Sequence, residues 1–227
     1  MNERMNRMLH EKRNETPEAP HTPGFPPQLK KIMRRVDPAL PNPDLVSYYA
    51  LEDDRKLYLE TEVDEDAFTI ERMILRFNME DAGKPRNERK PVYLYIYSPG
   101  GDVDIMWSLI DAIELSETPI ITVNMGVAAS AAGLIFLAGH RRIMLKRSRL
   151  VIHEGSARLQ GDAVKVMDAS ESYKKLMKQM QEFILSRTRI TSAALNKQKC
   201  HDWEINADYA LEHGACDMIA GTINDII

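Results

Sequence analysis

A serine and a histidine lie near the ends of two apolar segments, and these two side chains together could support nucleophilic catalysis. The apolar run 120–125 leads through a Gly-Val-Ala-Ala stretch to Ser130, and a second apolar run ends at His153. A serine hydroxyl becomes a nucleophile when a neighbouring base accepts its proton, and histidine is the commonest such base. Each residue also has a structural interpretation. Serine is a preferred N-cap residue, and His153 could be a hydrogen-bonded core histidine.

Two adjacent glycines, Gly100 and Gly101, follow another apolar run, 92–97. A helical pattern over 103–113 then leads to the run that precedes Ser130. Strand, turn, helix and strand in this order predict a crossover unit of a mostly parallel sheet. The glycines and the serine would then share the carboxyl edge of the sheet, where open α/β sheets bind ligands. Adjacent glycines usually mark only a turn, but bare backbone N–H groups beside a serine are also what an oxyanion hole requires.

A serine–histidine pair needs an acidic residue that orients the histidine. His153 is the base candidate because it should emerge at the same sheet edge as Ser130. Four other histidines have positions that favour other roles, namely His10 and His21 near the N-terminus, His140 in a charged turn and His213 by a helix C-terminus. Spacing leaves four candidates for the acid, which are Asp202, Asp162, Asp168 and Asp217.

The composition excludes several classes of function. The chain has 227 residues, 44% of them hydrophobic, and a formal net charge of −4, which predicts one sizeable core and no nucleic-acid surface. Its two cysteines, Cys200 and Cys216, are too few for a disulfide framework and lack metal-ligand spacing. The N-terminus has no apolar signal region, and the most apolar segment, 125–139, is too short to span a bilayer. We therefore expect a soluble cytoplasmic protein that does not span a membrane.

The first 44 residues differ in character from the rest. Eight of the twelve prolines fall there, among charged and polar residues, so we predict a flexible or partner-ordered arm over 1–44. A small amphipathic segment within the arm is indicated by helical spacing of Leu29, Ile32, Met33 and Val36. The globular pattern runs from 45 to 227.

The remaining patterns predict further elements of an α/β unit. Short strands are expected at 57–59, 142–145, 150–153 and near 218–219, and helices at 67–77, 162–188 and 206–213, the last closed by Gly214. At 1.5 Å per residue the helix over 162–188 would extend about 40 Å, which is long for a domain of this size. Its apolar positions indicate either contact with a neighbouring subunit or an ordinary core helix.

Three segments in this order resemble the proteolytic subunit of the Clp protease, the ClpP family. They are Tyr-Ile-Tyr-Ser-Pro-Gly-Gly at 95–101, Met-Gly-Val-Ala-Ala-Ser at 125–130 and Ser-Arg-Leu-Val-Ile-His at 148–153. The resemblance extends from about Asp53 to Ile219. It implies a ClpP/crotonase-like α/β fold with repeated β-β-α units, a mostly parallel sheet and a protruding handle helix at about 155–190.

The resemblance also implies roles for single residues. The serine of the Met-Gly-x-Ala-Ala-Ser motif, the family's nucleophile, falls on Ser130, and the histidine of the Ile-His motif, its base, falls on His153. The family's aspartate precedes the helix that ends in Glu-His-Gly-Ala-Cys-Asp, which gives Asp202. The oxyanion donors are the N–H groups of Gly101 and Ala131. No metal or cofactor takes part.

The resemblance also implies three kinds of partner. Further copies of the chain would form two heptameric rings that dock through the handle. An AAA+ unfoldase of the Clp type would bind the rings, and unfolded polypeptide would be the substrate.

Several positions depart from the family pattern. Val127 replaces a glutamine, Ala131 replaces a methionine, and Glu154-Gly155 stands where Gln-Pro is usual. The axial-loop segment that engages the unfoldase is not recognisable. These departures indicate a divergent or phage-type member, with altered specificity and partner choice.

Two other functions remain as hypotheses. The chain could be a catalytically silent ring subunit that serves mixed assemblies, although its complete Ser/His/Asp set argues against this. It could also be a crotonase-type acyl-CoA enzyme, because that fold uses paired N–H groups as an oxyanion hole without a triad.

Overall fold

The computed structural model describes residues 51, 53–153, 155, 160–198 and 201–227. The chain divides into two compact units, 1–53 and 54–227, and every predicted site residue belongs to the second. The predicted arm, 1–44, and its amphipathic segment lie outside the described residues.

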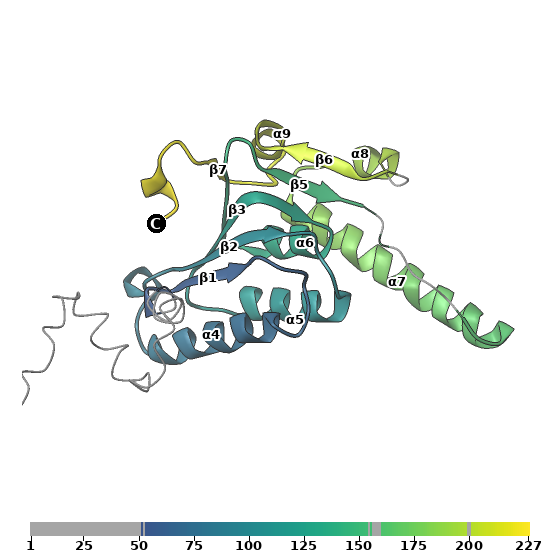
Figure 1. The fold of residues 1–227 in the computed structure, drawn as a ribbon, viewed down its shortest axis with the longest axis horizontal. Coiled ribbons are helices and arrows are strands. Elements are labelled where there is room, and N and C mark those ends of the chain that lie inside the picture. Colours follow the sequence, from purple (N-terminus) through teal and green to yellow (C-terminus); the bar gives the residue numbers. More distant parts are fainter. Residues whose placement is uncertain (1–50, 52, 154, 156–159, 199–200) are drawn as a thin grey trace, which may run out of the picture. The chain divides into compact units, whose positions relative to one another are not determined.

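Seven strands form one sheet within the described residues, in the order β1-β2-β3-β4-β7, with β5 and β6 as a branch (Figure 1). Their bounds are β1 Lys56–Leu59, β2 Val92–Ser98, β3 Ile120–Ala129, β4 Arg141–Met144, β5 Arg149–Ile152, β6 Trp203–Asn206 and β7 Met218–Ile219. The first half of β3 pairs with β4 and its second half with β5. All pairs are parallel except β5 with β6. This confirms the predicted α/β class with a mostly parallel sheet.

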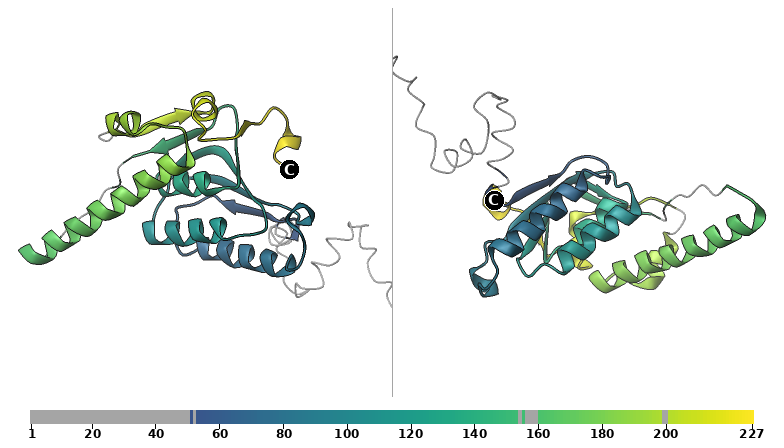
Figure 2. Two further views of the ribbon diagram at one scale, coloured as in Figure 1. Left: turned by 180° about the vertical axis from the view of Figure 1, so that it is seen from behind. Right: turned by 90° about the horizontal axis from the view of Figure 1, so that it is seen from below.

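The helices cover the sheet and extend beyond it (Figures 1 and 2). Their bounds are α4 Ala67–Glu80, α5 Val103–Glu114, α6 Ala131–Ala138, α7 Ala163–Arg187, α8 Ser192–Lys197 and α9 Ala207–Glu212, with 3-10 turns at η1 Arg86–Glu88 and η2 Ile223–Asp225. Helices α4 and α5 lie side by side against the sheet. All eight residues of α6 are buried, because its small and apolar side chains allow close packing on every side.

Helix α7 spans nearly the predicted range. The Asp162 side chain accepts a hydrogen bond from the Lys165 N–H and so caps its first turn. Among its apolar residues only Met180 and Ile184 are buried, whereas Val164 and Met167 are 68% and 69% exposed. Figure 2 shows that the N-terminal half of α7 projects away from the sheet, and the exposed Val164 and Met167 lie on this half.

The sequence patterns missed one α-helix and one strand, and two strands are displaced by one residue. Strands β4 and β5 each begin and end one residue before their predicted ranges. The missed elements are α8 and β6, of six and four residues, which are too short to give a clear period. No helix in the described part of the chain is both long and apolar enough to cross a membrane.

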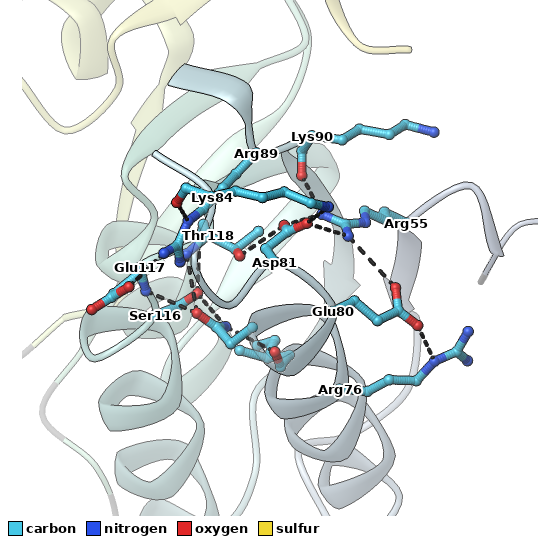
Figure 3. Close-up of polar contacts among 12 residues, drawn as sticks. Arg55, Arg76, Glu80, Asp81, Lys84, Arg89, Lys90, Ser116, Glu117 and Thr118 are labelled. Carbon is cyan, nitrogen blue, oxygen red and sulfur yellow. Dashed lines mark hydrogen bonds and ion pairs between the residues drawn. The ribbon is translucent and has the colours of Figure 1, made fainter. Parts of the chain in front are cut away.

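A buried ion pair joins the start of β1 to the end of α4 (Figure 3). Arg55 donates to both carboxylate oxygens of Asp81, at 2.5 and 3.0 Å, and to the Lys90 carbonyl oxygen at 2.6 Å. Asp81 is fully buried and also accepts hydrogen bonds from Lys84 and from the Thr118 hydroxyl, at 2.7 and 3.0 Å. The cluster links the segments that lead into β1, β2 and β3, so it fixes the edge of the sheet opposite to the predicted site.

Candidate active site

Ser130 occupies a strained turn between β3 and α6. Its backbone has φ 52° and ψ −124°, a conformation that L-residues rarely adopt. It holds the N-cap position of α6, yet its side chain makes no cap hydrogen bond. Its N–H donates to the Val151 carbonyl oxygen at 2.9 Å, which ties the turn to β5. The geometry thus argues against the cap interpretation, and a serine on a sharp strand-to-helix turn is typical of a nucleophile.

Gly100 packs directly against the Ser130 turn. A Cβ on Gly100 would lie 2.7 Å from both the Ala129 carbonyl oxygen and the Ser130 Cβ, and the glycine has φ +98°. Gly101 is equally constrained, because a Cβ there would lie 2.4 Å from the Val63 carbonyl oxygen. The two glycines are therefore required by contact as well as by conformation.

We expect Gly100→Ala to destabilise the fold strongly. The methyl group adds a collision with Ser130 to the strain of the positive φ, for a total of about 3 kcal/mol or more. Gly83→Ala is the matched control, because Gly83 has φ +80° but nothing within 4 Å of its would-be Cβ. It should cost about 1–2 kcal/mol. Thermal unfolding followed by circular dichroism measures both variants, and equal losses would contradict the packing argument.

Two backbone N–H groups, one directly after Ser130 in the chain and one directly after the glycine that packs on it, could receive a negative oxygen. They belong to Gly101 and Ala131, and no described residue accepts a hydrogen bond from either. The Ala131 nitrogen borders Gly100 closely, since a Cβ on that glycine would lie 3.0 Å from it. Ala131 is also the first residue of α6, where N–H groups lack partners within the helix. The arrangement has the composition of an oxyanion hole.

The pairing of β3 with β5 determines where His153 lies. Ala129 pairs with Val151, so Ser130 and His153 both lie just beyond the last paired residues at one edge of the sheet. The His153 side chain is 30% exposed, which is unlike a buried core histidine. No hydrogen bond joins it to Ser130 Oγ within the described residues. The predicted shared edge is thus present, whereas the described contacts of Ser130 include no hydrogen bond to the imidazole.

The antiparallel pairing of β5 with β6 brings Asp202 to His153. Ile152 pairs with Trp203. Because the strands are antiparallel, the residue after Ile152, His153, lies opposite the residue before Trp203, Asp202. The distance from His153 Nδ1 to Asp202 Oδ1 is 4.0 Å, an ion-pair contact longer than a hydrogen bond, and the carboxylate is 78% exposed.

The three other aspartates that spacing left as candidates have different surroundings. Asp162 caps α7, Asp168 is exposed on α7, and Asp217 binds the Arg142 guanidinium at 2.7 and 3.0 Å. Burial alone would raise the pKa of Asp217, but the hydrogen bonds from Arg142 outweigh it and lower that pKa. Of the four, Asp202 is the one that the strand pairing brings opposite His153.

Two further histidines have structural contacts. His140 Nδ1 accepts a hydrogen bond from the Ile120 N–H at 2.9 Å, and burial, with Arg86 and Arg187 nearby, lowers its pKa. His213 follows α9 and stacks on the Tyr209 ring at 3.8 Å. His10 and His21 lie outside the described residues.

An apolar pocket adjoins His153, and the sequence patterns did not predict it. Its walls come from β5, α7, α8 and β6, and they comprise Ile152, His153, Met177, Met180, Gln181, Ile184, Leu195, Gln198 and Trp203. The signal in the sequence was weak because the lining residues are scattered over several elements, two of which were missed. Within the described part of the chain, no group of three or more His, Cys, Asp or Glu side chains could hold a metal ion.

Comparison with known proteins identifies the family. A family model described as Clp protease matches residues 44–222, most of the chain. The chain belongs to the Clp protease family. This confirms the resemblance seen in the three sequence motifs, and the fold is consistent with the family.

Three relatives within the Clp protease family are named as proteolytic subunits. ATP-dependent Clp protease proteolytic subunit 2 of Treponema pallidum is 33% identical over 127 residues, 55% of this chain and 64% of that protein. The protein of the same name from Treponema denticola is 32% identical over 139 residues, 60% and 70% of the two chains. ATP-dependent Clp protease proteolytic subunit of Chlorella vulgaris is 30% identical over 200 residues, 86% and 96%. The match thus spans less than two thirds of the first relative and nearly all of the third.

Proposed function

We propose that the chain is a serine endopeptidase subunit in which Ser130 is the nucleophile, His153 the base and Asp202 the residue that orients the base. The observation that carries this proposal is the strained turn at Ser130, which packs on Gly100 and is hydrogen-bonded to Val151 of β5, the strand that directly precedes His153. The β5–β6 pairing supports the third assignment, because it sets Asp202 opposite His153.

In the proposed reaction His153 removes the proton from Ser130 Oγ as that oxygen attacks a peptide carbonyl carbon. Asp202 holds the imidazole in the required tautomer and stabilises its positive charge. The carbonyl oxygen becomes negative and receives hydrogen bonds from the Gly101 and Ala131 N–H groups. His153 then protonates the leaving amine, and water hydrolyses the acyl-enzyme by the same steps.

The apolar pocket beside His153 supports a preference at the cleaved bond. Its walls are mainly apolar, with Met177, Met180 and Leu195 among them and Gln181 and Gln198 at polar positions. We infer that it receives an apolar side chain of the substrate next to the scissile carbonyl, because burial of such a side chain contributes about 1.5–3 kcal/mol.

The proposal extends to assembly. The exposed Val164 and Met167 on the projecting half of α7 support contact with another copy of the chain, because isolated apolar side chains on a protruding helix gain free energy when covered. We propose stacked heptameric rings that enclose the Ser130 sites. We propose that an ATP-dependent unfoldase then supplies unfolded polypeptide, which fits the description of the relatives as proteolytic subunits of an ATP-dependent Clp protease.

Active-site labelling tests the proposal. A fluorophosphonate probe should form one covalent adduct, which peptide mass spectrometry should locate on Ser130, and Ser130→Ala should abolish it. Ser148→Ala, which alters a serine on the turn before β5, is the control and should retain the label. A label that persists in Ser130→Ala, or no label on the wild type in its assembled form, would remove the assignment.

A catalytically silent ring subunit is the second candidate. The 4.0 Å separation of His153 from Asp202, and the lack of a hydrogen bond between Ser130 and His153 within the described residues, favour it. The labelling experiment separates the two functions, because a silent subunit assembles into a ring but does not react with the probe.

A further inference from the structure

Tyr173 joins helix α7 to the backbone that follows His153. Its hydroxyl donates a hydrogen bond to the Gly155 carbonyl oxygen. Tyr173 belongs to the row of α7 residues that faces the domain, since Met177 and Met180 follow it at helical spacing and line the pocket beside His153. The same helix face therefore supports both the pocket and the segment after the base.

The backbone at Gly155 rests closely on this helix face. A Cβ on Gly155 would lie 3.3 Å from the Tyr173 hydroxyl oxygen and 3.8 Å from Met177 Cε. His153 itself lies beyond the last paired residue of β5, Ile152, so the strand ladder does not extend to it. Contacts outside the ladder therefore set the position of the imidazole, and the hydrogen bond from Tyr173 to the Gly155 carbonyl oxygen is one that lies close to it in the chain.

We propose that Tyr173 is a positioning residue for His153, which it holds in place through the Gly155 carbonyl. The inference rests on the proposed function, because it concerns the base of the proposed reaction. The hydrogen bond from Tyr173 fixes the backbone two residues after the base, and so limits the positions that the imidazole can take relative to Ser130. Removing the bond leaves Ser130, Asp202 and the pocket in place but lets the base occupy unproductive positions.

Tyr173→Phe tests this directly, because it removes the donor and keeps the ring. We expect kcat for a small fluorogenic peptide to fall about 10-fold, with KM changed less than about twofold. The reason is that misplacement of a reacting group lowers the rate constant of the chemical step. The rate of Ser130 phosphonylation should fall by the same factor. Tyr58→Phe on β1, at the far edge of the sheet, is the matched control and should leave both rates unchanged. Native mass and the unfolding midpoint should match wild type in both variants.

A double-mutant cycle with Gly155→Ala gives a second test that does not depend on one variant. The added methyl group must displace the Tyr173 hydroxyl, so Gly155→Ala alone should also slow phosphonylation several-fold. In the Tyr173→Phe background the same change should have little further effect, because the crowded oxygen is gone. If Tyr173→Phe reacts at the wild-type rate, or if the two effects multiply, the positioning role is wrong while the proposed function stands. If wild type does not react with the probe, both fall together.

Discussion

His153→Ala should lower kcat/KM for peptide hydrolysis by on the order of 10⁴-fold or more, without changing the mass of the assembly. Without an imidazole beside it, the Ser130 hydroxyl keeps its proton at neutral pH and attacks the carbonyl poorly. A fluorogenic peptide assay on the assembled protein, with native mass spectrometry on the same sample, measures both quantities. His140→Ala is the control for loss of a histidine. This variant removes the side chain that accepts a hydrogen bond from the Ile120 N–H, so it should alter stability more than turnover.

Asp202→Asn should have a smaller effect, which we place at roughly 10²-fold on kcat/KM. A buried aspartate in a serine-protease triad contributes about 10⁴-fold, but Asp202 is largely exposed and 4.0 Å from the imidazole. Asp168→Asn changes an exposed aspartate on α7 that spacing alone could not distinguish from Asp202, and it should leave kcat/KM unchanged. A larger loss in Asp168→Asn than in Asp202→Asn would overturn the assignment of the acid.

Asp81→Ala should destabilise the fold by about 3–5 kcal/mol, because it leaves the Arg55 guanidinium buried without its main partner. For a domain of this size the loss corresponds to a fall in the unfolding midpoint of roughly 6–20 °C. Glu80→Ala is the matched control on the same helix. Glu80 also contacts Arg55, at 3.6 Å, but its side chain is 44% exposed, so its loss should cost less than about 1 kcal/mol. Similar midpoints for the two variants would contradict the argument.

The same pair predicts a pH dependence of stability. The hydrogen bond from Arg55 lowers the pKa of Asp81 well below its usual range, against the opposing effect of burial, and Lys84 and Thr118 lower it further. A carboxyl group with a lowered folded-state pKa contributes stability above its unfolded pKa of about 4 and loses it as the pH falls towards the folded value. The difference in stability between wild type and Asp81→Asn should therefore be constant from pH 7 to about 5 and shrink below about 4. A difference that grows in acid would show that the carboxylate is not the stabilised form.

The parts of the fold that the sequence predicted well have strong local signals. The bounds of α7 agree with the prediction because Asp162 supplies a cap and Thr188 leaves the helical conformation with φ −136°. The shared position of Ser130 and His153 followed from two apolar runs that end at the same edge of a parallel sheet. Helix α9, from its Asn206 cap to Gly214 after its end, was likewise predicted from its capping residues.

The parts that the sequence could not predict depend on contacts between distant segments. Asp202 could not be distinguished from three other aspartates by spacing, because its place opposite His153 depends on β6, a four-residue strand with little periodicity. The apolar pocket was missed for the same reason, since Leu195 and Trp203 lie on the two short elements that no pattern indicated. The strain at Ser130 is a backbone property, and no side-chain pattern reports it.

The pairing of β5 with β6 also implies which parts of the chain tolerate a change of length. The connection over 188–198, which includes α8, leads to the ladder without belonging to it, so added residues there leave the pairing of Ile152 with Trp203 intact. One residue inserted within β6 would shift the pairing by a single step, and alternate side chains of a strand point to opposite faces. The carboxylate would then turn away from the imidazole although no residue of the site had been replaced.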